Sequence, residues 1–546
     1  MSKKQKYIFV VGGVMSGVGK GVSSSSIGTI LQAKGFAVTA VKIDPYINVD
    51  AGTMNPTEHG EVFVLSDGDE CDQDMGNYER FLNTNLTSTN YMTTGRVYQE
   101  VIRRERNLEY KGKNVEVVPD IPREVIRRIK LAGKETKSDI VIVEVGGTIG
   151  EYQNIIFLEA ARMLKIENPR DVAVVMVSYL PTPAKVGEMK TKPTQYASRT
   201  LNGTGIQADV IIARSDVSLD QKRKDKIAVF CNVPADRIIS APDADSIYDI
   251  PVNFEKDNLG DSLLKILSLP KRKTDLTAWM QFVDKKKKTK KEVKIAVVGK
   301  YFDSGDFVLS DVYISVIEAI KFSGVYAGVK PVLSFLNSKD FEKDPKRIKE
   351  LASYDGIIVP GGFGSSGIEG LIKTIEFARV NKIPYFGLCY GMQLMVIEYA
   401  RNVLGWKDAN TAEIDPKASK VVVHIMPDQK KKLEMKDFGG SMRLGSFEAK
   451  LKEGTVACRA YGAAMVFERH RHRYEVNEEY IADLEAKGLI FSGTSPDGHL
   501  MEIAELAEAK HPFFLGVQFH PEFLARPLAP HPLFTAFIKA AIKAKK

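Results

Sequence analysis

A cysteine, a histidine and a glutamate stand in a pattern that suits nucleophilic catalysis. Cys389 lies in GLCYG, between a strand-like run and the helix-like MQLMVIEYA, which is the spacing of a sharp strand-to-helix turn that presents a nucleophile. Near the C-terminus, GVQFHPE places His520 and Glu522 two residues apart at the end of a strand-like run. In an extended strand these two side chains share a face. We predict that Cys389 is the nucleophile, that His520 accepts its proton and that Glu522 orients the imidazole.

Three further segments supply what such a nucleophile needs. VPGGFG at 359–364 is a glycine-rich turn whose N–H groups can form an oxyanion hole. RHRHRYEVN at 469–477 concentrates guanidinium groups that suit a substrate α-carboxylate, and Glu413 can meet an α-ammonium. The structural alternative is a buried cysteine, which is the usual fate of a lone Cys. The combined pattern favours acyl transfer on a small amino-acid amide.

A second glycine-rich loop stands near the N-terminus. GGVMSGVGKGVS at 12–23 follows the strand-like YIFVVGG and precedes a helical stretch. Small residues let backbone N–H groups approach phosphate oxygens, and Lys20 adds a point charge. The strict GxxxxGK[ST] pattern fails, because Val14 stands where its first glycine belongs and Gly21 replaces Ser/Thr. The alternative is a tight turn without a ligand; we favour phosphate binding.

A bound nucleoside triphosphate requires a magnesium ion held by oxygen ligands. Asp74 lies in the acidic stretch DGDECDQDMG, and Glu144 stands at the end of the apolar run in DIVIVEVGGTIG. A carboxylate at the C-terminal end of a buried parallel strand is costly unless it serves a cation or a partner. For Asp74 the alternative is a solvated acidic loop. We expect Mg²⁺ at these two residues.

Short apolar runs separated by helical patterns must position these groups. Such runs are typical of parallel sheets buried on both faces. They begin near residues 7, 37, 139, 171 and 208 in the first half, and near 293, 356, 383 and 513 in the second. The predicted fold class is therefore α/β, with two doubly wound domains. We predict a first domain at 1–270, a linker at 271–292 and a second domain at 293–546.

Composition narrows the class of protein. A chain of 546 residues is too long for a single core, and no segment approaches the roughly 18 apolar residues of a membrane span. The four cysteines are widely scattered without metal spacing, which favours a reduced, cytoplasmic setting. Part of the net charge of +8 lies in DKKKKTKKEVK at 284–294. This run lacks aromatic residues, so we interpret it as a solvated linker and predict neither nucleic-acid nor membrane partners.

The ordered set of segments resembles the CTP synthase family, and the resemblance runs over nearly the whole chain. The first half is similar to an amidoligase domain related to P-loop synthetases. The second half is similar to a class I glutamine amidotransferase. The segments that carry the resemblance are KIDPYINVDAGTMNP, HGEVFV, YERF, TTGR, VEVGGTIG, GEMKTKPTQ, KIAVFCNVP, DSIYDIP, PGGFG, LCYGMQ, MRLG, ERHRHRYEVN and QFHPEF.

The resemblance implies a two-site reaction. Magnesium-ATP phosphorylates O4 of UTP, and glutamine is hydrolysed at Cys389. Ammonia then passes inside the protein and displaces phosphate at C4, giving CTP. Sequestration keeps the ammonia unprotonated and away from water. The resemblance also implies a homotetramer, GTP as an activator and CTP as a feedback inhibitor.

It further implies residue roles at the matching positions. Lys42 would steady phosphoryl transfer with Lys20, and Asp74 and Glu144 would hold magnesium. ATP would contact Gly17, Val18, Gly19, Lys20, Gly21, Val22 and Asp74. UTP or CTP would contact Ser16, Glu151, Tyr152, Gln153, Lys190, Thr191, Lys192, Pro193, Thr194, Gln195 and Lys226. Glutamine would contact Gly362, Tyr390, Gly391, Met392, Gln393, Glu413 and Arg473.

Five positions depart from the family pattern. Ser366, in GGFGSSG, stands where an arginine associated with GTP activation is usual, which predicts weak activation. Gln153 replaces a usual glutamate near the CTP product, which predicts altered feedback. Asp120 and Tyr196 each replace a usual histidine, and Tyr390 replaces the commoner leucine after the nucleophile.

Two rival readings have distinct consequences. A different amidoligase would use ATP and glutamine to amidate a carboxylate, but KTKPTQ and DPYINVD resemble pyrimidine-nucleotide segments. A nucleotide-sensing scaffold without turnover would have lost Lys20, Cys389 or His520, and all three are present.

Overall fold

The structure is a computed structural model that describes residues 4–185, 187–300, 310–434 and 440–545. It consists of two compact units. The first comprises residues 1–50 and 77–283, and the second comprises residues 51–76 and 284–546. Both are α/β, as the apolar runs predict. The observed units differ from the predicted division at a single linker. Residues 51–76 belong to the first half of the chain but pack with the second unit.

A parallel sheet forms the centre of the first unit. Within the described residues it has seven strands in the order β5-β2-β6-β1-β7-β8-β9. Its strands are β1 (Lys6–Gly12), β2 (Val38–Asp44), β5 (Tyr91–Thr93), β6 (Ile140–Val145), β7 (Val172–Tyr179), β8 (Val210–Ser215) and β9 (Ile238–Pro242). All neighbouring pairs run parallel. Every residue of β2 and β6 is buried, as expected for strands covered on both faces.

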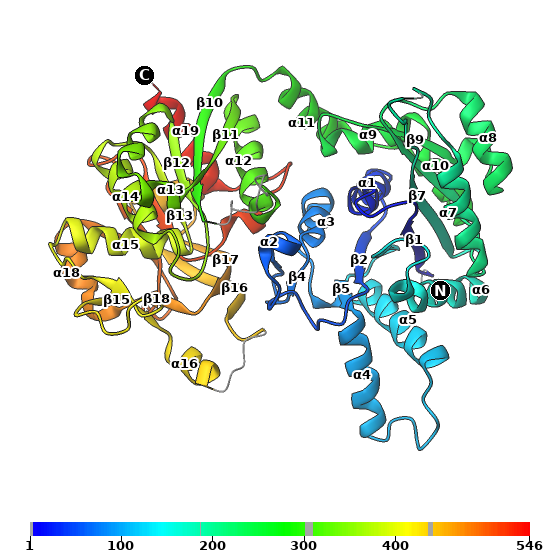
Figure 1. The fold of residues 1–546 in the computed structure, drawn as a ribbon, viewed down its shortest axis with the longest axis horizontal. Coiled ribbons are helices and arrows are strands. Elements are labelled where there is room, and N and C mark those ends of the chain that lie inside the picture. Colours follow the sequence, from blue (N-terminus) through cyan, green and yellow to red (C-terminus); the bar gives the residue numbers. More distant parts are fainter. Residues whose placement is uncertain (1–3, 186, 301–309, 435–439, 546) are drawn as a thin grey trace. The chain divides into compact units, whose positions relative to one another are not determined.

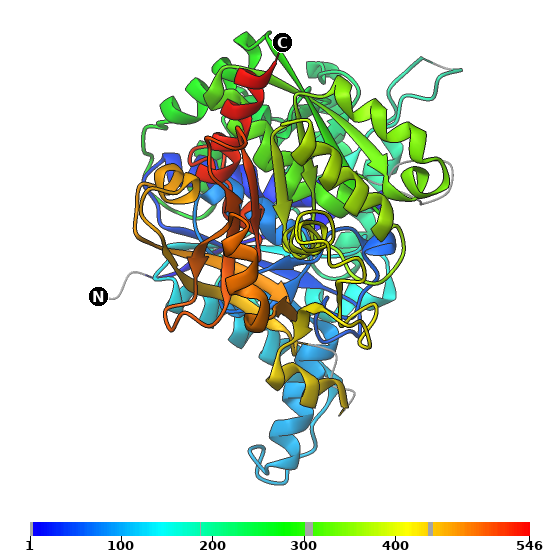
Figure 2. The ribbon, with the colours of Figure 1, turned by 90° about the vertical axis from the view of Figure 1, so that its left-hand side faces the viewer.

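Helices cover both faces of this sheet (Figure 1). They are α1 (Lys20–Ala33), α4 (Thr94–Arg106), α5 (Val117–Glu135), α6 (Ile155–Glu167), α7 (Lys192–Gly203), α8 (Gln221–Cys231), α9 (Ile250–Lys256) and α10 (Leu259–Ile266). α3 (Asp74–Leu82) begins at the edge of the 51–76 segment. In both views, α4 and the start of α5 extend beyond the sheet of their unit (Figures 1 and 2).

The register of the first sheet brings polar residues to one edge. Val10 of β1 pairs with Glu144 of β6, and Lys42 of β2 pairs with the same glutamate. The loop after β1 and the carboxylate of β6 therefore lie at the same carboxyl end of the sheet, where ligands bind in open α/β sheets.

The sheet of the second unit combines parallel and antiparallel strands. Its order is β11-β10-β12-β13-β21-β20-β19-β16-β17 within the part that the structure describes. The parallel strands are β10 (Glu292–Gly299), β11 (Lys330–Asn337), β12 (Gly356–Val359), β13 (Tyr385–Leu388) and β21 (Phe514–Val517). The antiparallel strands are β16 (Arg443–Leu451), β17 (Met465–His472), β19 (Leu489–Thr494) and β20 (Met501–Leu506).

Smaller elements complete the second unit. Its helices are α12 (Ile314–Ala327), α13 (Ser338–Lys343), α14 (Ile368–Val380), α15 (Tyr390–Asn402), α16 (Pro427–Glu434), α17 (Val456–Tyr461), α18 (Ile481–Ala486) and α19 (Pro532–Ala544). A small sheet contains β14 (Asn410–Thr411), β15 (Val421–Ile425) and β18 (Tyr474–Val476). The 51–76 segment contributes α2 (Pro56–His59), β3 (Phe63–Val64) and β4 (Glu70–Cys71).

The predicted linker at 271–292 contains a helix, α11 (Thr277–Lys288). Trp279 is buried, and its indole N–H donates to the carbonyl of Tyr248 at 2.7 Å, so the first turns of α11 pack on the first unit. Four lysines of the charge run form the last turn of α11, where cations interact favourably with the helix dipole. Among the residues described, no helix has the length and apolar character needed to cross a bilayer.

Candidate functional site

Cys389 occupies a strained turn between β13 and α15. Its φ of 48° and ψ of −95° are rare for an L-residue. The N–H of Cys389 donates to the carbonyl of Val517 at 2.6 Å, which ties the turn to β21. A Cβ added at Gly391 would lie 2.3 Å from the carbonyl oxygen of Val359, so only glycine fits there. The turn presents the thiol at the N-terminus of α15.

His520 and Glu522 form the predicted pair, but a different element positions them. Nδ1 of His520 lies 2.7 Å from Oε1 of Glu522. β21 ends at Val517, and His520 precedes the 3-10 turn Pro521–Leu524 that contains Glu522. The prediction of a shared strand face is therefore wrong. Pro521 cannot continue a central strand, so the chain turns and the contact forms within the turn.

Charge favours a protonated imidazole at this site. Burial alone would lower the pKa of His520, but the Glu522 carboxylate and the neighbouring Cys389 raise that pKa to about 10. The ring also stacks on Phe523, with centroids 5.1 Å apart. A cationic imidazole beside the sulfur can act as a general acid toward a leaving group. The three residues can therefore act together as an acyl-transfer site.

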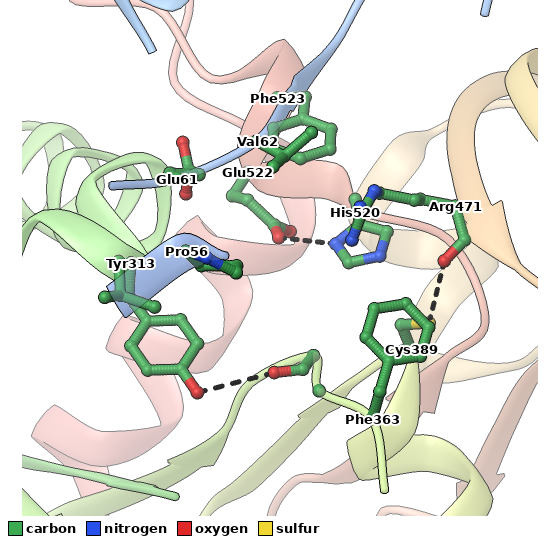
Figure 3. Close-up of a pocket in the computed structure, with 13 residues that line it drawn as sticks. Pro56, Glu61, Val62, Tyr313, Phe363, Cys389, Arg471, His520, Glu522 and Phe523 are labelled. Carbon is green, nitrogen blue, oxygen red and sulfur yellow. Dashed lines mark hydrogen bonds and ion pairs between the residues drawn. The ribbon is translucent and has the colours of Figure 1, made fainter. Parts of the chain in front are cut away.

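A small cavity of about 70 Å³ opens at the thiol (Figure 3). The ring of His520 lies between Glu522 and Cys389 in this view. The Cys389 Sγ contacts the carbonyl of Arg471 at 3.7 Å, and Tyr313 donates to the carbonyl of Gly361 at 3.5 Å. Pro56, Glu61 and Val62, all from the 51–76 segment, also line this cavity. A segment from the first half of the sequence therefore borders the thiol.

The 51–76 segment is held by the arginine-rich strand β17. The Arg469 guanidinium donates to the carbonyl of Val64 at 3.0 Å, and Arg471 Nε donates to Glu70 at 2.8 Å. Elsewhere in the segment, Glu61 accepts from the backbone N–H of Ser315 at 3.1 Å. Two of the guanidinium groups in RHRHRYEVN thus anchor the 51–76 segment, which the sequence did not predict.

The remaining residues expected to bind glutamine lie in the same unit. Glu413 accepts from the N–H of Gly364 at 2.7 Å, and burial raises its pKa. Arg473 donates to Gln429 at 3.1 Å. Gln393 donates to the carbonyl of Tyr474 at 2.9 Å and to Gln518 at 3.3 Å. Gly362 lines the cavity at Cys389, and Gly391, Met392 and Gln393 belong to the first turn of α15.

The loop between β1 and α1 has the geometry of an anion-binding turn. Gly17 and Gly19 adopt left-handed conformations with φ of 70° and 89°. Lys20 opens α1, and its Nζ donates to the carbonyl of Gly147 at 2.8 Å. A Cβ on Gly12 would lie 2.9 Å from that Nζ. The lysine therefore folds back over the end of β1. Gly21 and Val22 lie in α1, whose N-terminus favours a phosphate.

The carboxylate of Glu144 is buried beside this loop. Lys42 Nζ lies 2.9 Å from its Oε1, and Tyr78 donates to its Oε2. Lys42 also lies 3.7 Å from Asp44. The carboxylate oxygens of Glu144 and Asp44 are hard donors, and they fit a magnesium–phosphate complex, in which the ion takes few ligands from the protein. Asp74 begins α3, and its N–H donates to Asp72 at 2.9 Å. The described residues contain no group of three or more His, Cys, Asp or Glu side chains arranged for a metal.

The segment expected to bind the pyrimidine nucleotide leads into α7. Thr191 precedes α7 and accepts from Gln195 at 3.1 Å, and Thr194 bonds Ser178 at 2.8 Å. A Cβ on Gly13 would lie 2.7 Å from the Cβ of Ala197, so α7 packs against the phosphate loop. Lys190 pairs with Glu188 at 2.6 Å. Lys192 and Lys226 are exposed and Pro193 is partly buried, and Lys226 lies in α8.

Other predicted nucleotide contacts are exposed or partly exposed. Ser16 is exposed in the loop. Glu151 caps the N–H of Thr148 at 2.9 Å and accepts from Gln153 at 2.8 Å, while Tyr152 is 95% exposed. Glu151, Tyr152 and Gln153 lie in or beside the 3-10 turn Tyr152–Asn154.

The structure gives local roles to two departures from the family pattern. Asp120 accepts from the N–H of Glu116 at 3.0 Å in the first turn of α5. Tyr196 is exposed on α7, with the Arg199 guanidinium 5.8 Å from its ring centroid. Ser366 is exposed, directly before Gly367, which caps α14.

Several polar residues at these sites were missed from the sequence. Gln518 donates to the Cys389 sulfur at 3.6 Å. Arg214 pairs with Asp243 at 2.7 Å, and its guanidinium lies 2.8 Å from the Cβ position of Gly19 in the phosphate loop. Lys300 directly follows β10. Each stands at or just beyond the carboxyl end of a buried strand, which is the same pattern that singled out Glu144.

Comparison with known proteins gives two family matches. Residues 6–269 match a family described as CTP synthase N-terminus, and residues 308–540 match one described as glutamine amidotransferase class-I. The CTP synthase of Carboxydothermus hydrogenoformans is 48% identical over 542 residues, which cover 99% of each protein. The CTP synthase of Thermococcus gammatolerans has the same identity and coverage. The chain belongs to the CTP synthase family.

Membership in the CTP synthase family gives the chain its activity. It is a ligase that converts UTP to CTP in an ATP-dependent reaction, with glutamine as the nitrogen donor. A solved glutaminase domain of Trypanosoma brucei CTPS with bound acivicin is 38% identical and covers 46% of this chain and 94% of that chain, with a TM-score of 0.42.

Proposed function

We propose that the CTP synthase reaction is divided in this chain between Cys389, which releases ammonia from glutamine, and the loop after β1, which binds ATP. The observation that carries this proposal is the strained Cys389 turn beside the His520–Glu522 pair. The synthetase function is assigned to residues 1–270, the connection to 271–292 and the glutaminase function to 293–546. The 51–76 segment, which borders the thiol, is the exception to that division.

Glutamine hydrolysis begins with attack of the Cys389 thiolate on the carboxamide carbon. A C–S bond forms, and His520 gives its proton to the departing nitrogen, which leaves as ammonia. Water then attacks the thioester, His520 takes a proton from that water, and glutamate leaves with restoration of the thiolate. Glu522 keeps the imidazole oriented and stabilises its cation. N–H groups of the Gly361–Gly364 turn stabilise the oxyanion.

The bound glutamine is held at its other end by charge. Glu413 receives the α-ammonium and Arg473 the α-carboxylate. Gly362 and the turn from Tyr390 through Gly391 and Met392 to Gln393 surround the side chain. The position of all these residues within one unit supports this assignment.

UTP is activated at the carboxyl edge of the first sheet. Transfer of the ATP γ-phosphoryl group to O4 converts a poor leaving group into phosphate, which ammonia displaces at C4. Lys20 and Lys42 neutralise developing charge. ATP contacts Gly17 to Val22 and Asp74; the pyrimidine nucleotide contacts Ser16, Glu151 to Gln153, Lys190 to Gln195 and Lys226. Asp74 and Glu144 would hold Mg²⁺, which supplies charge neutralisation on the phosphates when bound.

Regulation and assembly follow from the same family. We infer a cytoplasmic homotetramer that CTP inhibits and that GTP activates weakly, because Ser366 replaces the usual arginine.

An assay of nitrogen source tests the proposal. The full-length protein is incubated with ATP, Mg²⁺ and UTP, and CTP is measured with glutamine or with ammonium chloride. Cys389→Ala should abolish synthesis from glutamine and retain synthesis from ammonia. Retention of both activities would remove Cys389 from the mechanism, and loss of both would show that the two sites are not separable.

A further inference from the structure

One residue next to the thiol cavity, Gly364, is held by hydrogen bonds at both its backbone N–H and its backbone carbonyl. The carbonyl oxygen of Gly364 accepts from Lys300 Nζ at 2.5 Å and from the Tyr390 hydroxyl at 3.1 Å. The N–H of the same residue donates to Glu413 at 2.7 Å. Gly364 has a φ of 76°, a conformation that glycine adopts at little cost. Three side chains from three parts of the second unit therefore fix the end of the Gly361–Gly364 turn.

Lys300 and Tyr390 also contact each other. The Nζ of Lys300 lies 4.9 Å from the centroid of the Tyr390 ring, within the range of a cation–π interaction. The two residues are 7% and 2% exposed. A desolvated ammonium is costly unless its charge is compensated, and the ring, the carbonyl and the Glu413 carboxylate provide that compensation. Tyr390 immediately follows Cys389, so the contact joins β10 to the start of α15.

The other end of the turn lies against the proposed proton-transfer residue. A Cβ added at Gly361 would lie 2.8 Å from Cε1 of His520. The carbonyl of Gly361 accepts from Tyr313 at 3.5 Å. Between these ends, the Phe363 ring lies 5.3 Å from the Arg471 guanidinium. The turn is short and packed at both ends, so a displacement of Gly364 is passed along it to the backbone beside His520.

We propose that Lys300 and Tyr390 are positioning residues for glutamine hydrolysis, which together hold the Gly364 carbonyl so that N–H groups of the turn face the oxyanion that forms at Cys389. This inference rests on the proposed role of Cys389. A leucine at position 390 would have neither the hydroxyl nor the aromatic face. Tyr390 therefore adds one hydrogen bond and one cation–π contact that such a residue could not make.

The protonation of Lys300 should make glutamine hydrolysis depend on pH, which gives a way to test this arrangement. Burial lowers the pKa of Lys300 to about 8, Glu413 and Glu342 oppose that shift, and Lys339 adds to it. Those three charged groups and the Tyr390 phenol face the ammonium from α13, the 411–415 turn and α15. As pH rises through about 8, Lys300 loses its proton, and the charge-assisted bond and the cation–π attraction weaken together. Glutamine hydrolysis should decline over that range.

The experiment measures glutamine hydrolysis by full-length variants with ATP and UTP present. Tyr390→Phe, which removes only the hydroxyl, should lower kcat/KM by about 3- to 10-fold, the effect of one neutral hydrogen bond. Lys300→Met should lower it by about 10- to 100-fold, the effect of a charged donor. Lys300→Arg keeps its charge above pH 8 and should move the alkaline decline to higher pH. A role in packing alone would leave that decline where it is.

Ammonia-dependent CTP formation in the same preparations distinguishes a specific effect on glutamine hydrolysis from a general loss of folded protein. Its rate should stay within about 2-fold of that of the parent protein, because the Gly361–Gly364 turn takes part only in glutamine hydrolysis. Lys294→Met, an exposed lysine on the same strand, is the matched control and should change neither activity. The inference would be overturned if Lys300→Met kept the wild-type kcat/KM for glutamine hydrolysis. It would also be overturned if Lys300→Arg and Tyr390→Phe lost glutamine hydrolysis and ammonia-dependent CTP formation to the same extent. A Cys389→Ala protein that still used glutamine would instead overturn the proposed function.

Discussion

Arg471 Nε donates to Oε1 of Glu70 at 2.8 Å, in an ion pair whose side chains are 12% and 0% exposed. Glu70 belongs to β4 of the 51–76 segment, and Arg471 belongs to β17. The carbonyl of the same arginine contacts the Cys389 sulfur, and its guanidinium lies over Phe363 of the Gly361–Gly364 turn. One residue therefore links the 51–76 segment to the thiol and to the turn beside it.

Removal of Glu70 should weaken both the fold and the use of glutamine. Glu70→Ala leaves a buried guanidinium without its carboxylate, which typically costs about 3–5 kcal/mol. Denaturant unfolding should reveal this loss, and glutamine-dependent synthesis should fall more than ammonia-dependent synthesis. The control is Glu508→Ala, which breaks an exposed pair with Arg459 and should cost less than about 1 kcal/mol. Equal effects of the two substitutions would contradict the assigned link.

The pH dependence of glutamine hydrolysis should follow Glu522. The Glu522 carboxylate helps raise the pKa of His520 to about 10, so the imidazole keeps its proton across the neutral range. Glu522→Gln removes that charge and lowers the pKa. The measurement uses a Lys300→Arg background, which keeps its charge and so removes the decline near pH 8 assigned to Lys300. The remaining loss of activity on the alkaline side should then move to lower pH, by about one unit or more. Profiles of kcat/KM against pH check this shift.

A second buried His–Glu pair provides the control for that profile. His531 and Glu468 lie 2.8 Å apart, away from the thiol cavity. Glu468→Gln should leave the alkaline limb unmoved. If Glu468→Gln shifts the alkaline loss of kcat/KM as far as Glu522→Gln does, that loss does not report on the protonation of His520.

Lys20 should be needed for synthesis from either nitrogen source. Lys20→Met removes the point charge at the loop after β1, where Lys20 bonds the carbonyl of Gly147. CTP formation should fall by about 10²- to 10³-fold with glutamine and with ammonia alike, because phosphoryl transfer precedes both. Glutamine hydrolysis should persist. Lys222→Met, an exposed lysine on α8 of the same unit, is the control, and near-normal synthesis by Lys20→Met would exclude the loop from ATP binding.

GTP should stimulate the wild-type protein weakly. It should stimulate the Ser366→Arg variant more strongly. Position 366 is exposed beside the Gly361–Gly364 turn, so an arginine fits there without displacing the core. A GTP titration of glutamine-dependent synthesis measures the change. Ser365→Arg places the same charge one residue away and should not reproduce it. Strong activation of the wild-type protein would show that other residues carry the GTP contact.

Local patterns predicted the parallel strands of both sheets and the turns at their carboxyl ends. Continuous apolar runs mark strands buried on both faces, and β1, β2, β6, β7 and β8 all formed where such runs stand. The antiparallel strands β16, β17, β19 and β20 were not predicted. β16 and β17 contain exposed and charged positions, and β20 carries two buried glutamates, so these three strands lack that continuous apolar pattern.

By itself, the sequence determined which groups we predict to carry the chemistry. The types and spacing of Cys389, His520 and Glu522 predict a nucleophile with its partners, because such chemistry demands particular side chains. Tertiary structure alone decided how they are supported. The packing of residues 51–76 with the second unit, the Glu70–Arg471 pair and the grip of Lys300 on Gly364 all join residues far apart in the chain. Local spacing carries no information about such contacts, because they form only when separate elements pack together.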